Sequence, residues 1–178
     1  MKLRIVAGEF GGRRISTPLG KATRPTRESV REAWFNVLGE RVVGARVLDL
    51  FSGSGALGLE ALSRGAAHVD FIEHAAGAVR ALEQNIEALN VVDRSVVYRE
   101  EAFAYLSRIA GSVAYEIALA DPPYDSDAAS RLIELNRTQP FARLLCVECR
   151  SELLIEPDVD LAWQRRYGDT TLAFFTSD

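Results

Sequence analysis

An Asp-Pro-Pro-Tyr sequence at residues 121–124 is the part of the chain best suited to chemistry. The exocyclic amine of a nucleobase is a poor nucleophile, because its lone pair is delocalised into the ring. The Asp121 carboxylate and the Pro122 carbonyl can each accept one N–H and hold the nitrogen towards a methyl donor. Tyr124 offers an aromatic face on which a base can stack. We therefore predict Asp121, Pro122 and Tyr124 as catalytic residues, although a stiff Pro-Pro turn after a strand is the simpler alternative.

A glycine-rich turn follows the short apolar strand 47–50 and has the spacing Gly53-x-Gly55-x-x-Gly58. Taken alone, this spacing suits a nicotinamide enzyme equally well. Asp49, however, lies inside the strand, where its carboxylate can pair with an ammonium group but would repel a pyrophosphate. The turn also has no nearby cation for a phosphate. The pattern therefore favours S-adenosylmethionine, with Asp49, Gly53 and Gly55 at the cofactor.

Two further residues are candidates for the same cofactor site. Glu73 ends the next apolar segment, 20 residues after Gly53, a spacing that suits hydrogen bonds to ribose hydroxyls. A solvated strand end is the plainer explanation of Glu73 alone. Phe51 directly precedes the glycine turn, where it either contacts the cofactor or packs beneath the turn.

Charge is unevenly distributed along the chain. The formal net charge is −4, yet residues 1–31 hold eight Lys or Arg residues against two acids, which gives +6 there and −10 in the remainder. A basic segment of this kind is typical of a nucleic-acid contact, because phosphate contacts dominate affinity. A solvated charged extension is the alternative. The arginines predicted to contact RNA are Arg4, Arg13, Arg14, Arg24, Arg27 and Arg31.

Strand-like and helical segments alternate through most of the chain and predict a parallel sheet with helical crossovers. The expected strands are 46–50, 68–73, 95–99, 115–120 and 143–149, and the expected helices are near 56–64, 75–89, 101–109 and 126–137. An apolar face at helical spacing, Val30 to Leu38, predicts a helix beginning after Thr26. Two short runs around Gly11-Gly12 and two around Gly168-Asp169 predict hairpins at the two ends of the chain.

Composition fits a compact cytoplasmic protein, with 48% hydrophobic and 26% charged residues. No run approaches the roughly 18 apolar residues of a membrane span. Cys146 and Cys149 form a C-x-x-C, but positions three apart in a strand face opposite sides, which disfavours a shared metal or a disulfide. We expect buried or half-buried thiols, no metal and no membrane association.

Several segments together resemble the bacterial 16S rRNA (guanine-N2)-methyltransferase family, and the resemblance spans nearly the whole chain. The glycine turn and Asp-Pro-Pro-Tyr are shared by many amino-methyltransferases, whereas the arginine-rich opening is more specific to this family. The matching segments are Arg4-Ile-Val-Ala-Gly8, Gly11-Gly-Arg-Arg14, Arg24-Pro-Thr26, Arg31-Glu-Ala-Trp-Phe-Asn36, Asp49-Leu-Phe-Ser-Gly-Ser-Gly55, Asp121-Pro-Pro-Tyr124 and Tyr167-Gly-Asp-Thr170.

The resemblance implies a Rossmann-like S-adenosylmethionine-dependent methyltransferase fold of the α/β class. Its mostly parallel seven-stranded sheet would end in an antiparallel hairpin, with a small β-hairpin extension at the N-terminus. It divides the chain into a basic arm, 1–25, and a catalytic domain, 26–178. It also implies that Glu101-Ala102, where the family usually has Asp-Ala, contacts the adenine. The expected substrate is 16S rRNA of the small ribosomal subunit, acted on by a monomer.

Three other functions remain open. A DNA adenine-N6 methyltransferase shares Asp-Pro-Pro-Tyr, but 178 residues leave little room for its target-recognition region. A protein or small-molecule methyltransferase would not need the basic opening. A non-enzymatic RNA-binding module would not explain why Asp49, Glu73 and Asp121 all fall near strand ends.

Overall fold

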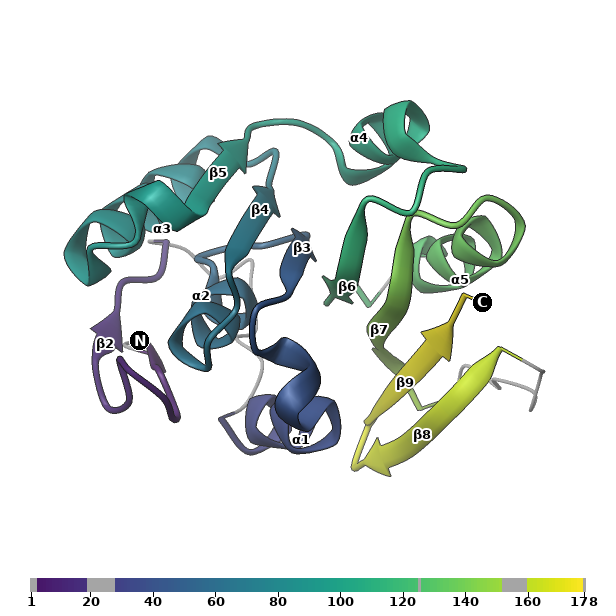
Figure 1. Ribbon diagram of the computed structural model, residues 1–178, viewed down its shortest axis with the longest axis horizontal. Helices are drawn as coiled ribbons and strands as arrows, with labels where there is room; N and C mark the ends of the chain where they lie inside the picture. The colour runs from purple at the N-terminus through teal and green to yellow at the C-terminus, as the bar shows by residue number, and fades with distance from the viewer. Residues whose placement is uncertain (1–2, 19–27, 125, 152–159, 178) are drawn as a thin grey trace.

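The computed structural model describes residues 3–18, 28–124, 126–151 and 160–177 (Figure 1). Its centre is a seven-stranded sheet in the order β5-β4-β3-β6-β7-β9-β8, in which the first five strands are parallel and β9 is antiparallel to both neighbours. The strands are β3 (Arg46–Leu50), β4 (His68–Ile72), β5 (Ser95–Tyr98), β6 (Tyr115–Ala120), β7 (Ala142–Arg150), β8 (Leu161–Tyr167) and β9 (Thr170–Thr176). This confirms the predicted fold class, including the C-terminal hairpin.

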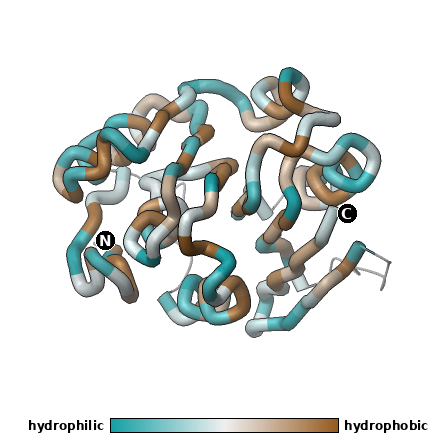
Figure 2. The backbone as a smooth tube through the Cα atoms, viewed as in Figure 1, coloured by the Kyte–Doolittle hydropathy of each residue, from teal (hydrophilic) through white to brown (hydrophobic). Residues whose placement is uncertain are grey.

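Helices cover both faces of the sheet, because alternate residues of each buried strand point to opposite faces. Val47 packs in a core with α1, α2 and α3, whereas its neighbour Leu48 packs in a second core with α4 and α5. In Figure 2, hydrophobic brown segments recur along the central strands, while the outer turns are mostly teal. The helices are α1 (Glu28–Leu38), α2 (Ala56–Ser63), α3 (Ala76–Leu89), α4 (Ala102–Ile109) and α5 (Ala128–Thr138), with short 3-10 turns η1 (Gly39–Val42) and η2 (Val92–Arg94).

The N-terminal hairpin consists of β1 (Leu3–Arg4) and β2 (Arg14–Ile15), paired antiparallel as predicted but shorter than the runs in the sequence. Its apolar side chains belong to the same core as α1 to α3. The Glu60 carboxylate of α2 accepts the N–H groups of Val6 (2.7 Å) and Ala7 (3.0 Å). The hairpin is therefore packed on the sheet domain, and the predicted division at residue 25 lies outside the described residues.

The connections place the reversal of strand order between β3 and β6. In open α/β sheets, ligands bind at the carboxyl ends of the strands beside such a switch point. The residues that follow β3 and β6 are the glycine turn and Asp-Pro-Pro-Tyr. The fold therefore brings together the two segments that the sequence analysis singled out. Among the described helices, none is long and apolar enough to cross a membrane.

Candidate active site

Four carboxylates gather along the carboxyl ends of four adjacent strands. The pairing register aligns Ile72, Leu50, Ala120 and Val147 in one row across β4, β3, β6 and β7. Asp49 stands one residue before this row. Glu73, Asp121 and Glu148 each stand one residue beyond it.

Asp49 is buried beneath the glycine turn, with 1% of its surface exposed. Its carboxylate accepts the N–H of Gly58 at 2.9 Å. Burial raises the pKa of Asp49, the nearby Asp121 and Glu73 carboxylates add to the rise, and the Gly58 bond opposes it, so that the pKa moves from the usual 3.8 to about 8. A cation bound here would relieve this unfavourable accumulation of negative charge.

Two glycines of the turn meet steric requirements that other residues do not. Gly55, the residue just before α2, has a φ of +84°, a left-handed conformation that glycine adopts readily. A Cβ at Gly58 would lie 2.3 Å from the Phe71 ring and 2.9 Å from the Asp49 carboxylate. The third glycine therefore permits α2 to pack directly against the sheet, as in dinucleotide-binding turns.

Phe51 is held in a strained conformation at the switch point. Its φ of +57° is a left-handed value that bulky residues rarely adopt. The ring packs edge-to-face on Phe103 of α4 with centroids 6.3 Å apart, and the Arg131 guanidinium lies 3.9 Å over the Phe103 ring. Phe51 thus contributes to an aromatic cluster beside the glycine turn.

Glu73 closes the other side of the turn. One carboxylate oxygen accepts the N–H of Gly53 at 2.9 Å, and the other accepts the N–H of Ala75 at 2.7 Å. The 20-residue spacing noted in the sequence is therefore a direct contact between strand end and glycine turn. Each carboxylate oxygen retains capacity for a further donor such as a ribose hydroxyl.

Glu101 and Ala102 lie at the start of α4. Glu101 occupies the cap position and is exposed, and Ala102 is buried as the first helical residue. The Glu101 carboxylate lies 3.8 Å from Nδ1 of His74, which is also 3.5 Å from the Glu73 carboxylate. His74 therefore links the two acids that the sequence analysis assigned to ribose and adenine.

Tyr124 is fixed by its hydroxyl group. The hydroxyl donates to the Glu148 carboxylate of β7 at 2.5 Å and lies 2.7 Å from the Thr170 hydroxyl of β9. Burial and the bond to Glu148 both raise the pKa of Tyr124, so the phenol stays protonated. The Arg150 guanidinium lies 6.0 Å over the ring.

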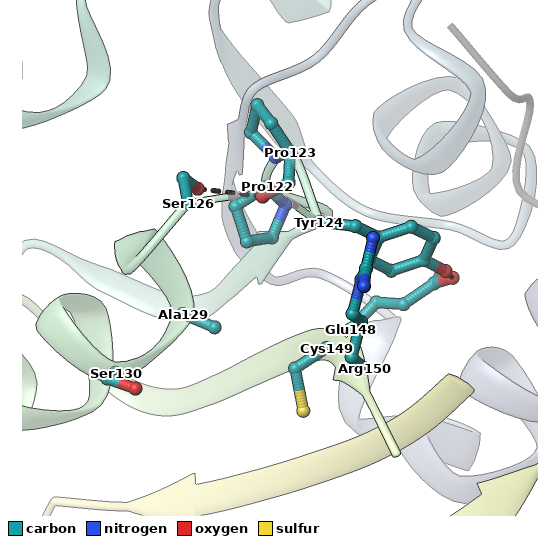
Figure 3. A pocket seen from close by; sticks show the side chains of 9 residues that line it. All are labelled: Pro122, Pro123, Tyr124, Ser126, Ala129, Ser130, Glu148, Cys149 and Arg150. Atoms are coloured by element: carbon teal, nitrogen blue, oxygen red, sulfur yellow. Dashed lines mark hydrogen bonds between the residues drawn. The ribbon is translucent and has the colours of Figure 1, made fainter. Parts of the chain in front are cut away.

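A pocket of about 240 Å³ opens beside this loop (Figure 3). Figure 3 shows Tyr124, Glu148 and Arg150 close together on one side, with Cys149 and the start of α5 on the other. The nine lining residues are Pro122, Pro123, Tyr124, Ser126, Ala129, Ser130, Glu148, Cys149 and Arg150.

The predicted RNA-contacting arginines have different environments. Arg14 is exposed, while Arg4 pairs with Glu28 at 3.0 Å and Arg13 donates to the Ala88 carbonyl. Arg31 requires a correction, because only 1% of it is exposed and it donates to the Arg4 carbonyl at 2.6 Å inside the protein. Arg24 and Arg27 lie outside the described residues.

Both cysteines are free and buried, and they pack in the two different cores, as their spacing predicted. In the described part of the chain, no three His, Cys, Asp or Glu side chains gather in a way that could hold a metal ion.

Three residues with important contacts carried no assigned role in the sequence analysis. Glu60 anchors the N-terminal hairpin, and Asn85 joins Ser16 to the carbonyl of Ser54 in the glycine turn. Thr170 contacts Tyr124. A buried acid in an apolar helix was the available signal for Glu60, whereas nothing in the local sequence indicated Asn85 or Thr170.

Known proteins are similar to this chain in both sequence and fold. A family described as "Conserved hypothetical protein 95" matches residues 3–176. Ribosomal RNA small subunit methyltransferase D of Escherichia coli K12 is 37% identical over 134 residues, which are 75% of this chain and 66% of that protein. The putative rRNA methyltransferase YlbH of Bacillus subtilis is 36% identical over 134 residues, 75% of this chain and 73% of that protein.

Among solved structures, the putative methyltransferase yhhF from Escherichia coli superposes with a TM-score of 0.84 at 30% identity, over 99% of this chain and 98% of that one. The sheet order and the glycine turn define a Rossmann-like S-adenosylmethionine-dependent methyltransferase fold. The relatives identify the family within this fold. The chain belongs to the "Conserved hypothetical protein 95" family, that of ribosomal RNA small subunit methyltransferase D.

Proposed function

We propose that this protein methylates the exocyclic N2 amine of a guanine in 16S rRNA, using S-adenosylmethionine. The observation that carries the proposal is the position of Asp121-Pro-Pro-Tyr124 at the switch point, adjacent to the acidic glycine turn. The names of both relatives support ribosomal RNA as the substrate class, and that of the Escherichia coli relative supports the small subunit. The protein would act as a monomer in the cytoplasm, where ribosomal subunits assemble.

The residues present fit S-adenosylmethionine. Its ammonium and sulfonium groups carry positive charge, and the glycine turn is bordered by the carboxylates of Asp49, Glu73 and Asp121. When bound, the cofactor supplies an electrophilic methyl group. Asp49 would hold the ammonium end beside Gly53 and Gly55, and Glu73 would bind the ribose hydroxyls.

Phe51, Glu101 and Ala102 would border the adenine. Phe51 and α4 meet through Phe103, which brings these residues to one side of the turn. The exposed Glu101 carboxylate is an acceptor for the adenine amine, in place of the aspartate usual in the family.

The base would be held by the loop after β6. Asp121 accepts one N–H of the guanine amine and the Pro122 carbonyl accepts the other, so the nitrogen lone pair points to the methyl group. Tyr124 stacks on the turned-out base, which is cheapest to extrude from a single-stranded loop. No covalent adduct with the protein is required. Neither cysteine follows a proline in the manner of cytosine-C5 enzymes, and burial raises the pKa of Cys149 to about 11.

Substrate RNA would be held by arginines of the N-terminal arm and of the residues just after it. Arg4, Arg13 and Arg14 lie on the hairpin, and Arg24 and Arg27 follow it in the sequence. Arg31 is omitted because it is buried. We propose that residues 1–25 act as this arm and residues 26–178 as the catalytic domain.

The test is transfer of labelled methyl from S-adenosylmethionine to small subunits, naked rRNA and duplex DNA that lack the modification. The wild type is compared with Asp121→Ala and with Asp93→Ala, a control at an exposed acid before β5. We expect N2-methylguanine in rRNA, a loss of at least about 100-fold with Asp121→Ala, and no loss with the control. Label in DNA adenine alone, or full activity of Asp121→Ala, would contradict the proposal.

A further inference from the structure

The hydroxyl group of Tyr124 is the meeting point of three separate segments. Tyr124 lies in the loop after β6, Glu148 lies in β7 and Thr170 begins β9. The two bonds to the hydroxyl, 2.5 Å to Glu148 and 2.7 Å to Thr170, hold the far end of the ring. The near end is held by the backbone that follows Pro122 and Pro123, whose φ angles are restricted.

Glu148 is an unfavourable residue at its buried position, and the hydrogen bond donated by the Tyr124 hydroxyl compensates for its burial. It lies in a strand of buried apolar residues and has 3% of its surface exposed. A buried carboxylate needs hydrogen-bond donors, because burial without them is strongly unfavourable. The Tyr124 hydroxyl is such a donor, and β7 and β9 pair Arg150 with Thr170 so that the Thr170 hydroxyl reaches the same point.

We propose that Glu148 and Thr170 are positioning residues that fix the direction of the Tyr124 ring, on which the substrate base stacks. The inference rests on the proposed function, because it assigns the ring a role in orienting the base. When both ends of the ring are held, its long axis keeps one direction. A ring held only by its backbone rotates about its side-chain bonds and loses the alignment that methyl transfer needs.

The proposal makes a specific kinetic prediction. Tyr124→Phe keeps the aromatic face but removes the hydroxyl, so the base still binds and the KM for RNA should stay within about 2-fold. The kcat should fall about 10-fold, since alignment rather than binding is lost. Glu148→Leu, which removes the acceptor, and Thr170→Val should lower kcat in the same way, and Thr170→Ser, which keeps the hydroxyl, should retain activity.

A double-mutant cycle tests whether Glu148 acts through Tyr124. If it does, Glu148→Leu should cost less than about 2-fold in the Tyr124→Phe background. An undiminished 10-fold loss in that background would overturn the proposal, as would single variants with wild-type kcat. Thr176→Val, the same change as Thr170→Val at the far end of β9, is the control and should leave kcat unchanged.

Urea unfolding checks that each variant is folded. The Kd of each variant for S-adenosylmethionine should match that of the wild type. If Glu148→Leu does not fold, Thr170→Val takes its place in the cycle. The cycle is measured on whichever acceptor the wild type labels. Wild-type activity on DNA alone would therefore refute the rRNA function, whereas uncoupled losses on any acceptor would refute the positioning role.

Discussion

Asp49→Asn should stabilise the cofactor-free protein near pH 8 and weaken its binding of S-adenosylmethionine. Asp49 is buried, and its pKa is raised from 3.8 to about 8. The two values differ by about four pH units, and each unit corresponds to about 1.4 kcal/mol. Burial of this carboxyl therefore costs up to about 6 kcal/mol of unfolding free energy at pH 8. Asparagine keeps an oxygen that can accept the Gly58 N–H, so we expect a recovery of about 2–4 kcal/mol.

The sign of the pH dependence follows from the raised pKa. The folded protein binds the proton more tightly than the unfolded chain, so the contribution of this group is fully present below pH 3.8. It is lost as the pH rises towards 8. The stability difference between Asp49→Asn and wild type should therefore grow in favour of the variant from pH 4 to pH 8 and stay constant above it.

Urea unfolding of both proteins at pH 5, 6.5 and 8 measures this difference, and calorimetry measures the Kd for S-adenosylmethionine. The variant should bind at least about 10-fold more weakly, because it lacks the charge that would pair with the ammonium group. Asp93→Asn, at an exposed acid, should follow the wild type throughout. A variant that is less stable than wild type at pH 8, or a difference that does not vary with pH, would refute this account of Asp49.

Two further predictions concern the glycine turn and the arginines. Gly58→Ala should lower the unfolding free energy by about 1–3 kcal/mol in urea unfolding, because the added Cβ would lie 2.3 Å from the Phe71 ring. Arg14→Ala should weaken rRNA binding several-fold and reduce the slope of log affinity against log salt concentration by about one. Its unfolding free energy should change by no more than about 0.5 kcal/mol. Arg31→Ala should show the opposite, a stability loss of about 2–4 kcal/mol with little direct effect on RNA contact, because this buried guanidinium lies near Glu60 and bonds a backbone carbonyl. Filter binding at two salt concentrations and urea unfolding separate the two arginines, and equal behaviour would contradict the assignment.

The order and type of the elements were predictable because each segment has a clear period and a turn signal at its end. Strands 46–50 and 115–120 have the predicted bounds, and the hairpin around Gly168-Asp169 is present. The short turns η1 and η2 were not predicted, since three or four residues carry no period.

Arg31 was misassigned because charge was counted without regard to helix position. It stands three residues before Trp34 and seven before Leu38, a spacing that places it on the buried face of α1. The periodicity that predicted the helix therefore contained the signal for its burial.

The acidic residues of the candidate site were predictable because they lie at the ends of strands. The contacts that depend on how neighbouring strands align were not predictable. The carboxyl ends of β3, β4 and β6 are adjacent in any sheet of this order, so Asp49, Glu73 and Asp121 were expected together. The contact between Tyr124 and Thr170 depends on how β7 and β9 align, which the local sequence does not specify.

The attachment of the N-terminal hairpin determines how its role can be studied. Glu60 is fully buried, and its carboxylate accepts the N–H groups of Val6 and Ala7 and contacts Arg64 at 2.8 Å. Deleting the first residues would remove two of these donors and uncover the core beneath Ile5 and its neighbours. A truncated protein that failed to act on RNA would then report a damaged scaffold. The described hairpin is an integral part of the packed core, so the proposed RNA contact is best tested by side-chain replacements on its outer surface.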